Sequence, residues 1–581
     1  WDIERPGRKV ADTRDWSAKT KDGKKPSAPA ITTADGTLLE RRDWLARNEA
    51  DANPRVTTRL NFLSESDVQA DTKFTNLFII EARDGAKPVA LAPDFESLGI
   101  PPGGAQEGGS APAWSADGKW LFVTGRLTAG QREHPDRLQA NDLIRISADG
   151  KSREALGVLP AHSKTAPVVS PDGKSVAIMI SELAKEGYAQ TGIGLWTEGQ
   201  PARVLETQLD RSVGQVKWSA DGTELWFIAP SQGDYVLYRT PTRGGRAIAF
   251  SAARTGVTAF DISRDHAIYV RTSIENPSEL FMSPLAKHEP KTLSAHNSEW
   301  LRGKQLAPME HRVLARPDGL KVDTWLMKPT QFEAGKKYPL LLQIHGGPSA
   351  MWGPGEPSMW HEFQFFAARG YGIVFCNPRG SGGYGFDFQH ANFQNWGPGP
   401  GADVLGAVDL ACREPWVDAT KLVITGGSYG GYLTAWILTQ DQRFKAAVAQ
   451  RGVYDLTTFF GEGNAWRLVP RHFGGYPWER ATRSVLDANS PFVHVAAIRT
   501  PLLIQHGDVD YRTGVTQSQM LYKALKVLGR PVEYARYPRA THELSRSGDP
   551  KQRVDTMVRY EEFFSRFVSQ ASGASEAGGT N

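Results

Sequence analysis

Hydrophobic and polar positions follow different patterns in the two halves of the chain. Up to about residue 300, short apolar runs alternate with polar turns, as in antiparallel strands joined by hairpins. Beyond that point, apolar runs of strand length such as Leu340–Ile344 and Gly372–Cys376 alternate with stretches of helical spacing. Buried strands alternating with helices are typical of a parallel α/β sheet. We therefore expect two domains, with the boundary near residues 293–304.

A repeated unit marks the first domain. The sequence Trp114–Gly118 recurs around Asp172 and Asp221, and more weakly around Asp265, at intervals of roughly 45 to 55 residues, the period of propeller blades. The Asp-Gly pair supplies the positive φ angles that a tight hairpin turn needs. A second hairpin follows in each unit, which gives four strands per unit. Residues 1–300 are therefore expected to form a β-propeller.

Four blades are recognisable, and Thr57–Phe62 with Asn76–Ile80 supplies much of a fifth. Residues before about Pro54 are polar and poorly periodic, so either the natural chain begins earlier or its first blades have diverged. The chain begins at Trp1 and not at Met, which leaves its compartment open between the cytoplasm and, after processing, the periplasm or the exterior.

One glycine-rich turn in the second half carries candidate chemistry. The sequence Gly426–Gly431 joins the apolar run Lys421–Thr425 to a segment of helical spacing. This is the context of a nucleophile elbow, in which Ser428 occupies a strained turn and the flanking glycines let strand and helix pass closely. The N–H of Tyr429 would then lie at a helix N-terminus, where it could stabilise an oxyanion.

Partners for such a serine follow in the order that this fold requires. The apolar run Thr500–Gln505 is followed by Asp508 and Asp510, and the next predicted strand, Val532–Tyr537, is followed by His542. Open α/β sheets bind ligands at the carboxyl ends of their strands, so these side chains are expected to meet Ser428 there. Spacing does not distinguish Asp508 from Asp510 as the acid.

A second loop at the same sheet edge follows the run Leu340–Ile344. Its sequence, His345–Pro348, contains two glycines that allow the backbone to approach a substrate, which suits a second oxyanion donor. An ordinary Gly-Pro turn is the alternative. The loop Asn377–Gly385 follows the next strand, and chemistry alone assigns it no role.

Composition removes several classes of function. A net charge of +4 on 581 residues gives no reason to expect nucleic acid or an anionic membrane as partner, and no apolar run is long enough to span a bilayer. The two cysteines, Cys376 and Cys412, are expected to be buried thiols. His361, His390 and His472 lack metal-ligand spacing, so we expect no metal and no cofactor. Association into homo-oligomers stays open.

Several motifs together resemble those of the prolyl oligopeptidase family of serine peptidases, particularly its acylaminoacyl-peptidase and dipeptidyl-peptidase-like branches. The resemblance covers nearly the whole length. The matching segments are His345–Pro348, Asn377–Ser381, Gly426–Gly431, His506–Thr513 and His542–Ser547.

The resemblance implies an α/β-hydrolase domain over residues 301–568, and the Ser-, Ala- and Gly-rich composition of residues 569–581 predicts a flexible tail. It selects Asp510 as the acid and implies oxyanion donors at the backbone of Tyr429 and Gly347. Some branches of the family use a tyrosine hydroxyl where this chain has His345. The resemblance further implies the following substrate-binding residues: Arg512, with a surface ion pair as the alternative, and Phe460, Trp466 and Tyr432, with core or lid packing as the alternative.

The expected function is a serine peptidase that acts on short peptides through an acyl-enzyme, with the propeller excluding folded proteins. Alternatives are a dipeptidyl aminopeptidase, an esterase of small esters on the same residues, and a scaffold protein with an inactive hydrolase domain. Dipeptidyl cleavage needs carboxylates that capture a free α-amine. Glu40, Glu182 and Glu186 are only loose candidates, which favours blocked N-termini or internal bonds.

Overall fold

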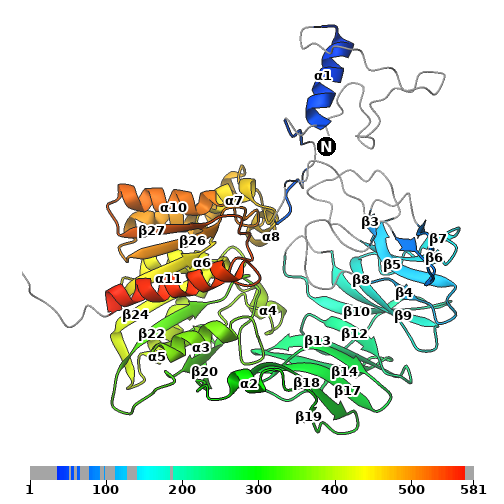
Figure 1. The fold of residues 1–581 in the computed structure, drawn as a ribbon, viewed down its shortest axis with the longest axis horizontal. Coiled ribbons are helices and arrows are strands. Elements are labelled where there is room, and N and C mark those ends of the chain that lie inside the picture. Colours follow the sequence, from blue (N-terminus) through cyan, green and yellow to red (C-terminus); the bar gives the residue numbers. More distant parts are fainter. Residues whose placement is uncertain are drawn as a thin grey trace, which may run out of the picture.

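Two bodies lie side by side in the computed structural model, which describes residues 36–50, 54–57, 60, 62–65, 68, 77–91, 97–98, 111–126, 141–183 and 187–568. The first is all-β apart from helix α1 (Leu38–Ala50), which the sequence pattern did not predict. The second is a mixed, mostly parallel α/β sheet with helices on both faces (Figure 1). The predicted fold class is therefore confirmed.

Small antiparallel sheets with the topology of propeller blades make up the first body. One contains β3 to β7, one β8 to β11, and an eight-stranded sheet joins β12 to β15 with β16 to β19 through a single parallel pairing of Tyr235 with Gly256. The strands are β3 (Ser97–Leu98), β4 (Ala113–Trp114), β5 (Trp120–Arg126), β6 (Asp142–Ser147), β7 (Arg153–Ala155), β8 (His162–Val169), β9 (Ser175–Glu182), β10 (Thr191–Thr197), β11 (Arg203–Val204), β12 (Gly214–Trp218), β13 (Glu224–Ser231), β14 (Asp234–Pro241), β15 (Ile248–Ala249), β16 (Gly256–Ile262), β17 (His266–Ser273), β18 (Asn276–Pro284) and β19 (Lys291–Thr292).

The repeated sequence motif forms the tight turn between the first two strands of each unit. Ser115 donates a hydrogen bond to Asp117 Oδ1 at 2.7 Å, and the same oxygen accepts the Lys119 N–H at 3.1 Å. The serines before Asp172 and Asp221 make the same contact at 2.6 Å. The motif recurs because each turn needs both this side-chain bridge and a glycine at positive φ.

The number of blades in the whole propeller stays a prediction. Strand β1 (Phe78–Ile79), from the segment expected to form part of a fifth blade, pairs with β2 (Val89–Ala90) in a two-stranded sheet. Several residues of the predicted fifth blade, Asn76 among them, lie outside the described residues, as do the early turn near Asp35 and the tail 569–581.

The second body is built on one sheet of order β20-β21-β23-β22-β24-β25-β26-β27, in which the pairs from β23 to β27 are parallel. All five strand segments expected from apolar runs are strands of this sheet. The strands are β20 (Met309–Ala315), β21 (Lys321–Met327), β22 (Tyr338–Ile344), β23 (Gly372–Cys376), β24 (Val417–Gly427), β25 (Phe444–Gln450), β26 (Leu502–Gly507) and β27 (Val532–Tyr537).

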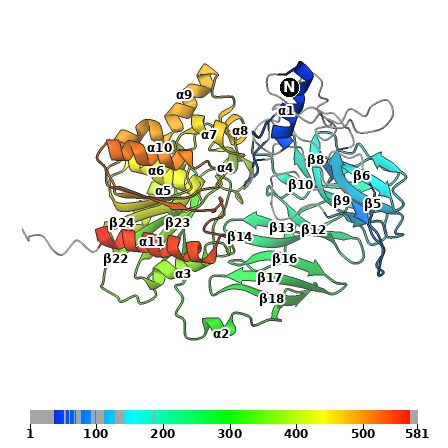
Figure 2. The same cartoon turned by 45° about the horizontal axis from the view of Figure 1, so that its top comes forward.

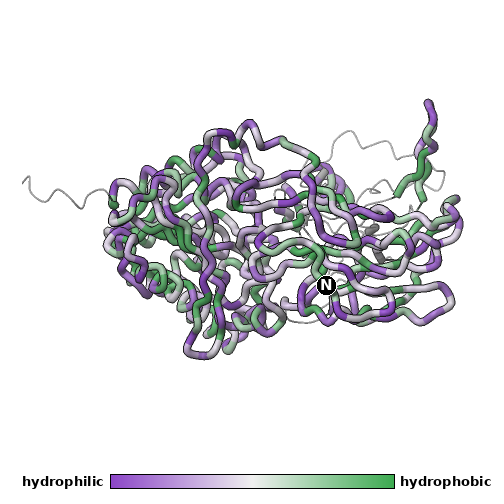
Figure 3. The backbone as a smooth tube through the Cα atoms, turned by 90° about the horizontal axis from the view of Figure 1, so that it is seen from below, coloured by the Kyte–Doolittle hydropathy of each residue, from purple (hydrophilic) through white to green (hydrophobic). Residues whose placement is uncertain are grey.

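Helices cover both faces of the sheet, which explains its nearly continuous apolar strands. One buried cluster joins it to α5, α6 and α10, and another joins it to α3 and α11. Figure 3 shows hydrophobic stretches in the interior of this body. The helices are α2 (Ser298–Leu301), α3 (Trp360–Ala368), α4 (Phe386–His390), α5 (Pro398–Ala411), α6 (Tyr429–Gln440), α7 (Leu456–Glu462), α8 (Leu468–Phe473), α9 (Arg480–Asn489), the 3₁₀ helix Pro491–Ala497, α10 (Thr516–Val527) and α11 (Pro550–Val568).

The two bodies lie against each other (Figure 2), and their contacts include close-packed glycine backbones and a buried tyrosine ring. A Cβ on Gly256 would lie 1.7 Å from the Gly355 oxygen, so no larger residue fits at that crossing. Tyr188, only 1% exposed, donates a hydrogen bond to Asn392 Oδ1 at 2.7 Å and lies 2.7 Å from His472 Nδ1. These contacts fix the first body over the carboxyl edge of the sheet.

Within the described part of the chain, no helix combines the length and the hydrophobicity that crossing a membrane requires.

Candidate active site

Ser428 occupies the predicted elbow between β24 and α6. Its backbone adopts φ 59° and ψ −122°, a strained conformation for a residue with a side chain. A Cβ on Gly426 would lie 2.4 Å from the Gly430 oxygen, and one on Gly430 would lie 2.2 Å from the Ile344 oxygen. Both glycines are therefore required for strand and helix to cross at this distance, and the crossing holds the serine at the edge of the sheet.

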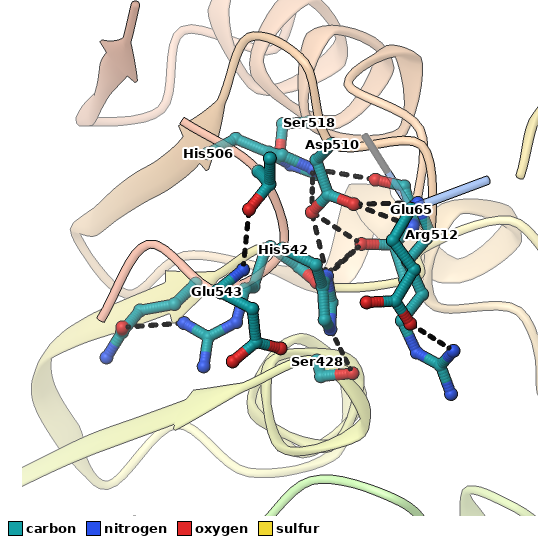
Figure 4. A network of polar contacts seen from close by, with 12 residues as sticks. Glu65, Ser428, His506, Asp510, Arg512, Ser518, His542 and Glu543 are labelled. Carbon is teal, nitrogen blue, oxygen red and sulfur yellow. Dashed lines mark hydrogen bonds and ion pairs between the residues drawn. The ribbon is translucent and has the colours of Figure 1, made fainter. Parts of the chain in front are cut away.

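Three side chains from separate loops meet at this edge (Figure 4). The Ser428 Oγ lies 3.0 Å from His542 Nε2, and His542 Nδ1 lies 2.8 Å from Asp510 Oδ2. His542 is 1% exposed and Asp510 is 2% exposed. This order of hydroxyl, imidazole and carboxylate is the one that activates a serine by removing its proton.

Geometry decides between the two aspartates that spacing left open. Asp508 is partly exposed and accepts a hydrogen bond at 2.8 Å from Nε of Arg536, a residue of β27. Only Asp510 reaches His542. Its Oδ1 accepts the backbone N–H groups of Arg512 at 2.9 Å and Thr513 at 3.0 Å, which fixes the plane of the carboxylate.

A second buried histidine contacts the same carboxylate. His506 Nε2 lies 2.7 Å from the Thr513 oxygen and 3.2 Å from Asp510 Oδ2, and its Nδ1 lies 2.6 Å from Ser518 Oγ. Because a carbonyl only accepts, the proton of His506 is on Nε2, where it also faces Asp510. In the sequence, His506 is the first residue of the segment that contains Asp510. The sequence analysis assigned no role to this histidine.

Burial and charge set the protonation states. Burial acts to raise the pKa of Asp510, but the facing His542 and His506 rings outweigh it and hold that pKa well below its ordinary value. Burial lowers the pKa of His542 to about 4, and Asp510 opposes that shift only in part. At neutral pH the pair is therefore a carboxylate beside a neutral imidazole, the state in which His542 can accept a proton.

The predicted oxyanion donors lie on either side of the serine. Tyr429 begins α6, so its N–H is one of the unpaired donors of a helix N-terminus. Gly346 packs against the serine, since a Cβ there would lie 3.4 Å from Ser428 Cβ, and Gly347 follows it in the wall of the same cavity. His345 is turned inward, with Nε2 2.9 Å from Ser381 Oγ, and burial lowers its pKa to about 4.

The loop after β23, whose role the sequence left open, supports this wall. Asn377 Oδ1 accepts the Trp352 N–H at 2.9 Å, and Asn377 Nδ2 donates to the Trp352 oxygen at 2.8 Å. Arg379 holds the start of the same loop through the buried Asp403, with Nε 2.8 Å from Oδ2. The segment that follows His345 is thereby fixed beside the serine.

Arg512 lies at the site and is already paired. Its Nη1 donates to Glu65 Oε1 at 2.9 Å, and the backbone carbonyl of Glu65 accepts the Tyr511 N–H at 3.4 Å. Both side chains are about one third exposed, 39% and 31%, and both line the cavity that contains Ser428. Glu65 comes from the N-terminal body, and no local motif marks it in the sequence.

The predicted aromatic subsite lies elsewhere. Tyr432 is wholly buried on α6 and donates to the Asn489 oxygen at 2.6 Å, so the expected substrate contact is corrected to a packing role. Phe460 and Trp466 pack edge to face at 5.6 Å, and Phe460 also contacts the exposed Trp478. None of the three predicted residues lines the cavity that contains Ser428.

A cavity of about 360 Å³ extends from Ser428 and His542 beneath the loop that follows His345. Its walls contain Gly346, Gly347 and Trp352 from that loop and Tyr235 from β14 of the first body. Polar residues that the sequence analysis missed also line it: Gln343, Thr425, Gln450, Arg451 and Glu362, which are buried, and Glu356, which is partly exposed.

Other residues singled out from the sequence lie outside this cavity. Glu40 bonds Thr37 at the start of α1, Glu182 ends β9, and Glu186 is outside the described residues. His390 and His472 pack against Tyr188 with ring centroids 5.0 and 4.5 Å apart. Among the residues that the structure describes, no three His, Cys, Asp or Glu side chains form a metal-binding group, and Cys376 and Cys412 are free thiols.

Comparison with known proteins agrees with the motifs and this geometry. Residues 357–570 match the model of the prolyl oligopeptidase family. The uncharacterized peptidase YuxL of Bacillus subtilis is 37% identical over 360 residues, which cover 60% of this chain and 53% of that protein. Dipeptidyl-peptidase 5 of Porphyromonas gingivalis is 26% identical over 480 residues, which cover 80% of this chain and 68% of that protein. The chain thus spans about half the length of the first of these relatives.

Among solved structures, an acylaminoacyl peptidase of Pyrococcus horikoshii superposes with a TM-score of 0.69 at 26% identity, covering 80% of this chain and 72% of that one. The likeness includes the all-β body as well as the α/β body. Residues 357–570, which include the elbow serine in its strained turn, therefore match the prolyl oligopeptidase family.

Proposed function

We propose that this chain is a serine peptidase that hydrolyses short peptides through an acyl-enzyme. The observation that carries the proposal is the buried array in which Ser428 Oγ lies 3.0 Å from His542 Nε2 and His542 Nδ1 lies 2.8 Å from Asp510. A neutral imidazole held in this orientation is a general base for the serine hydroxyl.

In the first step Ser428 attacks the carbonyl carbon of the scissile bond while His542 takes the hydroxyl proton. The oxyanion that forms is held by the N–H groups of Tyr429 and Gly347. His542 then gives the proton to the leaving amine, which departs and leaves an ester on Ser428. Water, deprotonated by His542, attacks this ester and releases the acid. Asp510 keeps the Nδ1 proton in place and stabilises the imidazolium at each step.

The N-terminal body restricts the substrate to short peptides. It contributes Glu65 and Tyr235 to the wall of the cavity that contains Ser428, so a substrate must fit between the two bodies. Arg512 is proposed to hold a substrate carbonyl near the scissile bond. Glu65, the carboxylate of that body in the described cavity wall, is neutralised by Arg512, which favours blocked N-termini or internal bonds over capture of a free α-amine.

Labelling by a fluorophosphonate probe tests the proposal directly. Wild type should react at Ser428, identified by mass spectrometry of the labelled peptide, and Ser428→Ala should not react while remaining folded. Hydrolysis of an N-acetyl aminoacyl anilide, its free-amine counterpart and a simple acyl ester would follow. Full activity in Ser428→Ala would refute the mechanism, and activity on the ester alone would replace the peptidase assignment with an esterase.

A further inference from the structure

Polar and mostly buried side chains line one part of the cavity that contains Ser428, which we call the polar recess. Gln343, on β22, is 1% exposed, lines the recess, and has no hydrogen-bond partner at either amide atom among the described residues. A buried amide without partners is costly, by about 1 to 3 kcal/mol. Its two polar atoms face space large enough for a side chain.

Two carboxylates lie in the same recess without an ion pair. Glu362, on α3, is 4% exposed, and Glu356 accepts hydrogen bonds only from Ser358, at 2.6 Å from its Oγ and 3.1 Å from its N–H. No ion pair within the described residues reaches either carboxylate, although such pairs hold Glu65 and Glu543 nearby. Burial raises the pKa of Glu362 to about 7, and the Tyr560 hydroxyl and the Arg451 guanidinium oppose that shift only in part.

One cation is also buried here. Arg451 is 6% exposed, its backbone is strained at φ 38°, and its Nε has no partner in the described part of the chain. Its guanidinium packs on Gly427, where an added Cβ would lie 3.1 Å from Nη2. Once the pairs of Arg512 and Arg546 with their glutamates are set aside, two carboxylates face one guanidinium. When both carboxylates are ionised, the recess carries one negative charge more than this guanidinium compensates.

We propose that this recess binds a cationic group of the substrate, the ammonium or guanidinium of a lysine or arginine side chain on the leaving-group side of the scissile bond. A cation there would neutralise the excess charge of Glu356 and Glu362 and donate to Gln343 Oε1. We place the recess on the leaving-group side because the cavity wall next to it is formed by Glu543, Ser545 and Arg546. These residues directly follow His542, which protonates the leaving amine. The inference rests on the proposed peptidase function and specifies its substrate.

Internally quenched peptides that differ only in the residue after the scissile bond test the proposal, with lysine, arginine, norleucine, glutamine or glutamate at that position. Mass spectrometry of the products confirms the cleaved bond. Wild type should favour lysine over norleucine in kcat/KM by about tenfold or more, because a site that holds a charged group leaves its partners unpaired without it. The ratio should fall toward one in Glu362→Gln, Glu356→Gln and their double variant.

Control variants distinguish a loss of the lysine preference from a loss of folding. Glu299→Gln removes an exposed carboxylate on α2 and should retain the lysine preference. Gln343→Met removes the unpaired amide without a change of charge and should lower the preference in part. Fluorophosphonate labelling of Ser428 at the wild-type rate would show that each variant is folded and active.

An unchanged lysine-to-norleucine ratio in a labelled Glu356→Gln, Glu362→Gln double variant would overturn the proposal. The same peptides with free and acetylated N-termini distinguish a side-chain cation from an α-ammonium. If the glutamate variants altered only the preference for a free N-terminus, the assignment to the leaving-group side would be wrong. Cleavage of neutral peptides without a cation preference would refute this inference alone, whereas an unreactive Ser428 would refute the peptidase function itself.

Discussion

Replacing the acid of the proposed site, Asp510→Asn, tests the reasoning most sharply because the structure dictates how the new carboxamide would sit. Asp510 Oδ1 accepts two backbone N–H groups, from Arg512 and Thr513, and Oδ2 faces His542 Nδ1. The carboxamide oxygen must stay with the two backbone donors, since an NH₂ group there would leave both unpaired. Its NH₂ group would therefore point at His542.

An NH₂ group facing Nδ1 forces the imidazole into the wrong tautomer. Nδ1 must then accept, the proton moves to Nε2, and the nitrogen 3.0 Å from Ser428 Oγ can no longer take the hydroxyl proton. Loss of the same interaction in a chymotrypsin-type triad lowers kcat by about 10⁴-fold. We expect a loss of that order here, or about 5 kcal/mol of transition-state stabilisation.

The assay is kcat for a peptide anilide together with the rate of fluorophosphonate labelling, with Asp508→Asn as the matched control. Asp508 lies two residues earlier on the same loop and is held only by the partly exposed Arg536, so its loss should cost at most about 1 kcal/mol of stability and leave kcat unchanged. Equal losses in the two variants, or more than a tenth of wild-type kcat in Asp510→Asn, would refute the assignment.

Three further predictions follow from single contacts. Burial lowers the pKa of His542, and this base acts only when it is neutral. As pH falls, kcat/KM should therefore decline with an apparent pKa below the ordinary 6.5 of histidine. A pH profile with its midpoint above 6.5 would contradict this. Gly430→Ala should destabilise the fold by about 2 to 3 kcal/mol in denaturant titration, because its Cβ would lie 2.2 Å from a carbonyl oxygen of β22; an unchanged midpoint would show that the strand and helix can separate. Tyr188→Phe should weaken the contact between the two bodies by about 1 to 3 kcal/mol, since it leaves Asn392 Oδ1 unpaired, and hydrogen exchange at residues 187–195 should rise; equal protection would assign the contact to packing alone.

Local signals explain why the nucleophile could be predicted. A strand, a glycine-rich turn and a helix follow one another between Val417 and Gln440 around Ser428, and each has its own sequence pattern. Because the acid and the base follow the serine in a fixed order along the chain, the two strands that precede them could also be predicted. The choice of Asp510 over Asp508 depended on which side chain the loop turns toward His542, which spacing does not encode.

Long-range convergence explains what the sequence pattern missed. Glu65 reaches Arg512 across 447 residues, and Gln343 and Glu362 come from a strand and a helix with no motif of their own. Gln343 is a single polar residue in an apolar strand, whereas Glu65 and Glu362 have polar neighbours in the sequence, so none of the three signals a function until its buried partners are known. The aromatic subsite failed for the opposite reason. Tyr432 directly follows the elbow in sequence, but α6 turns it into the core.

Strained backbone and buried polar atoms without hydrogen-bond partners occur together at the cavity that contains Ser428. Ser428 and Arg451 hold positive φ angles, and Gln343 and Glu362 are buried without full compensation, whereas the sheet beneath them has paired strands and apolar side chains. Features of this kind cost stability and persist only where the surrounding structure enforces them. In this chain the two glycines of the elbow and the backbone donors to Asp510 supply that enforcement, so the paired strands of the sheet hold the strained serine and its acid in place.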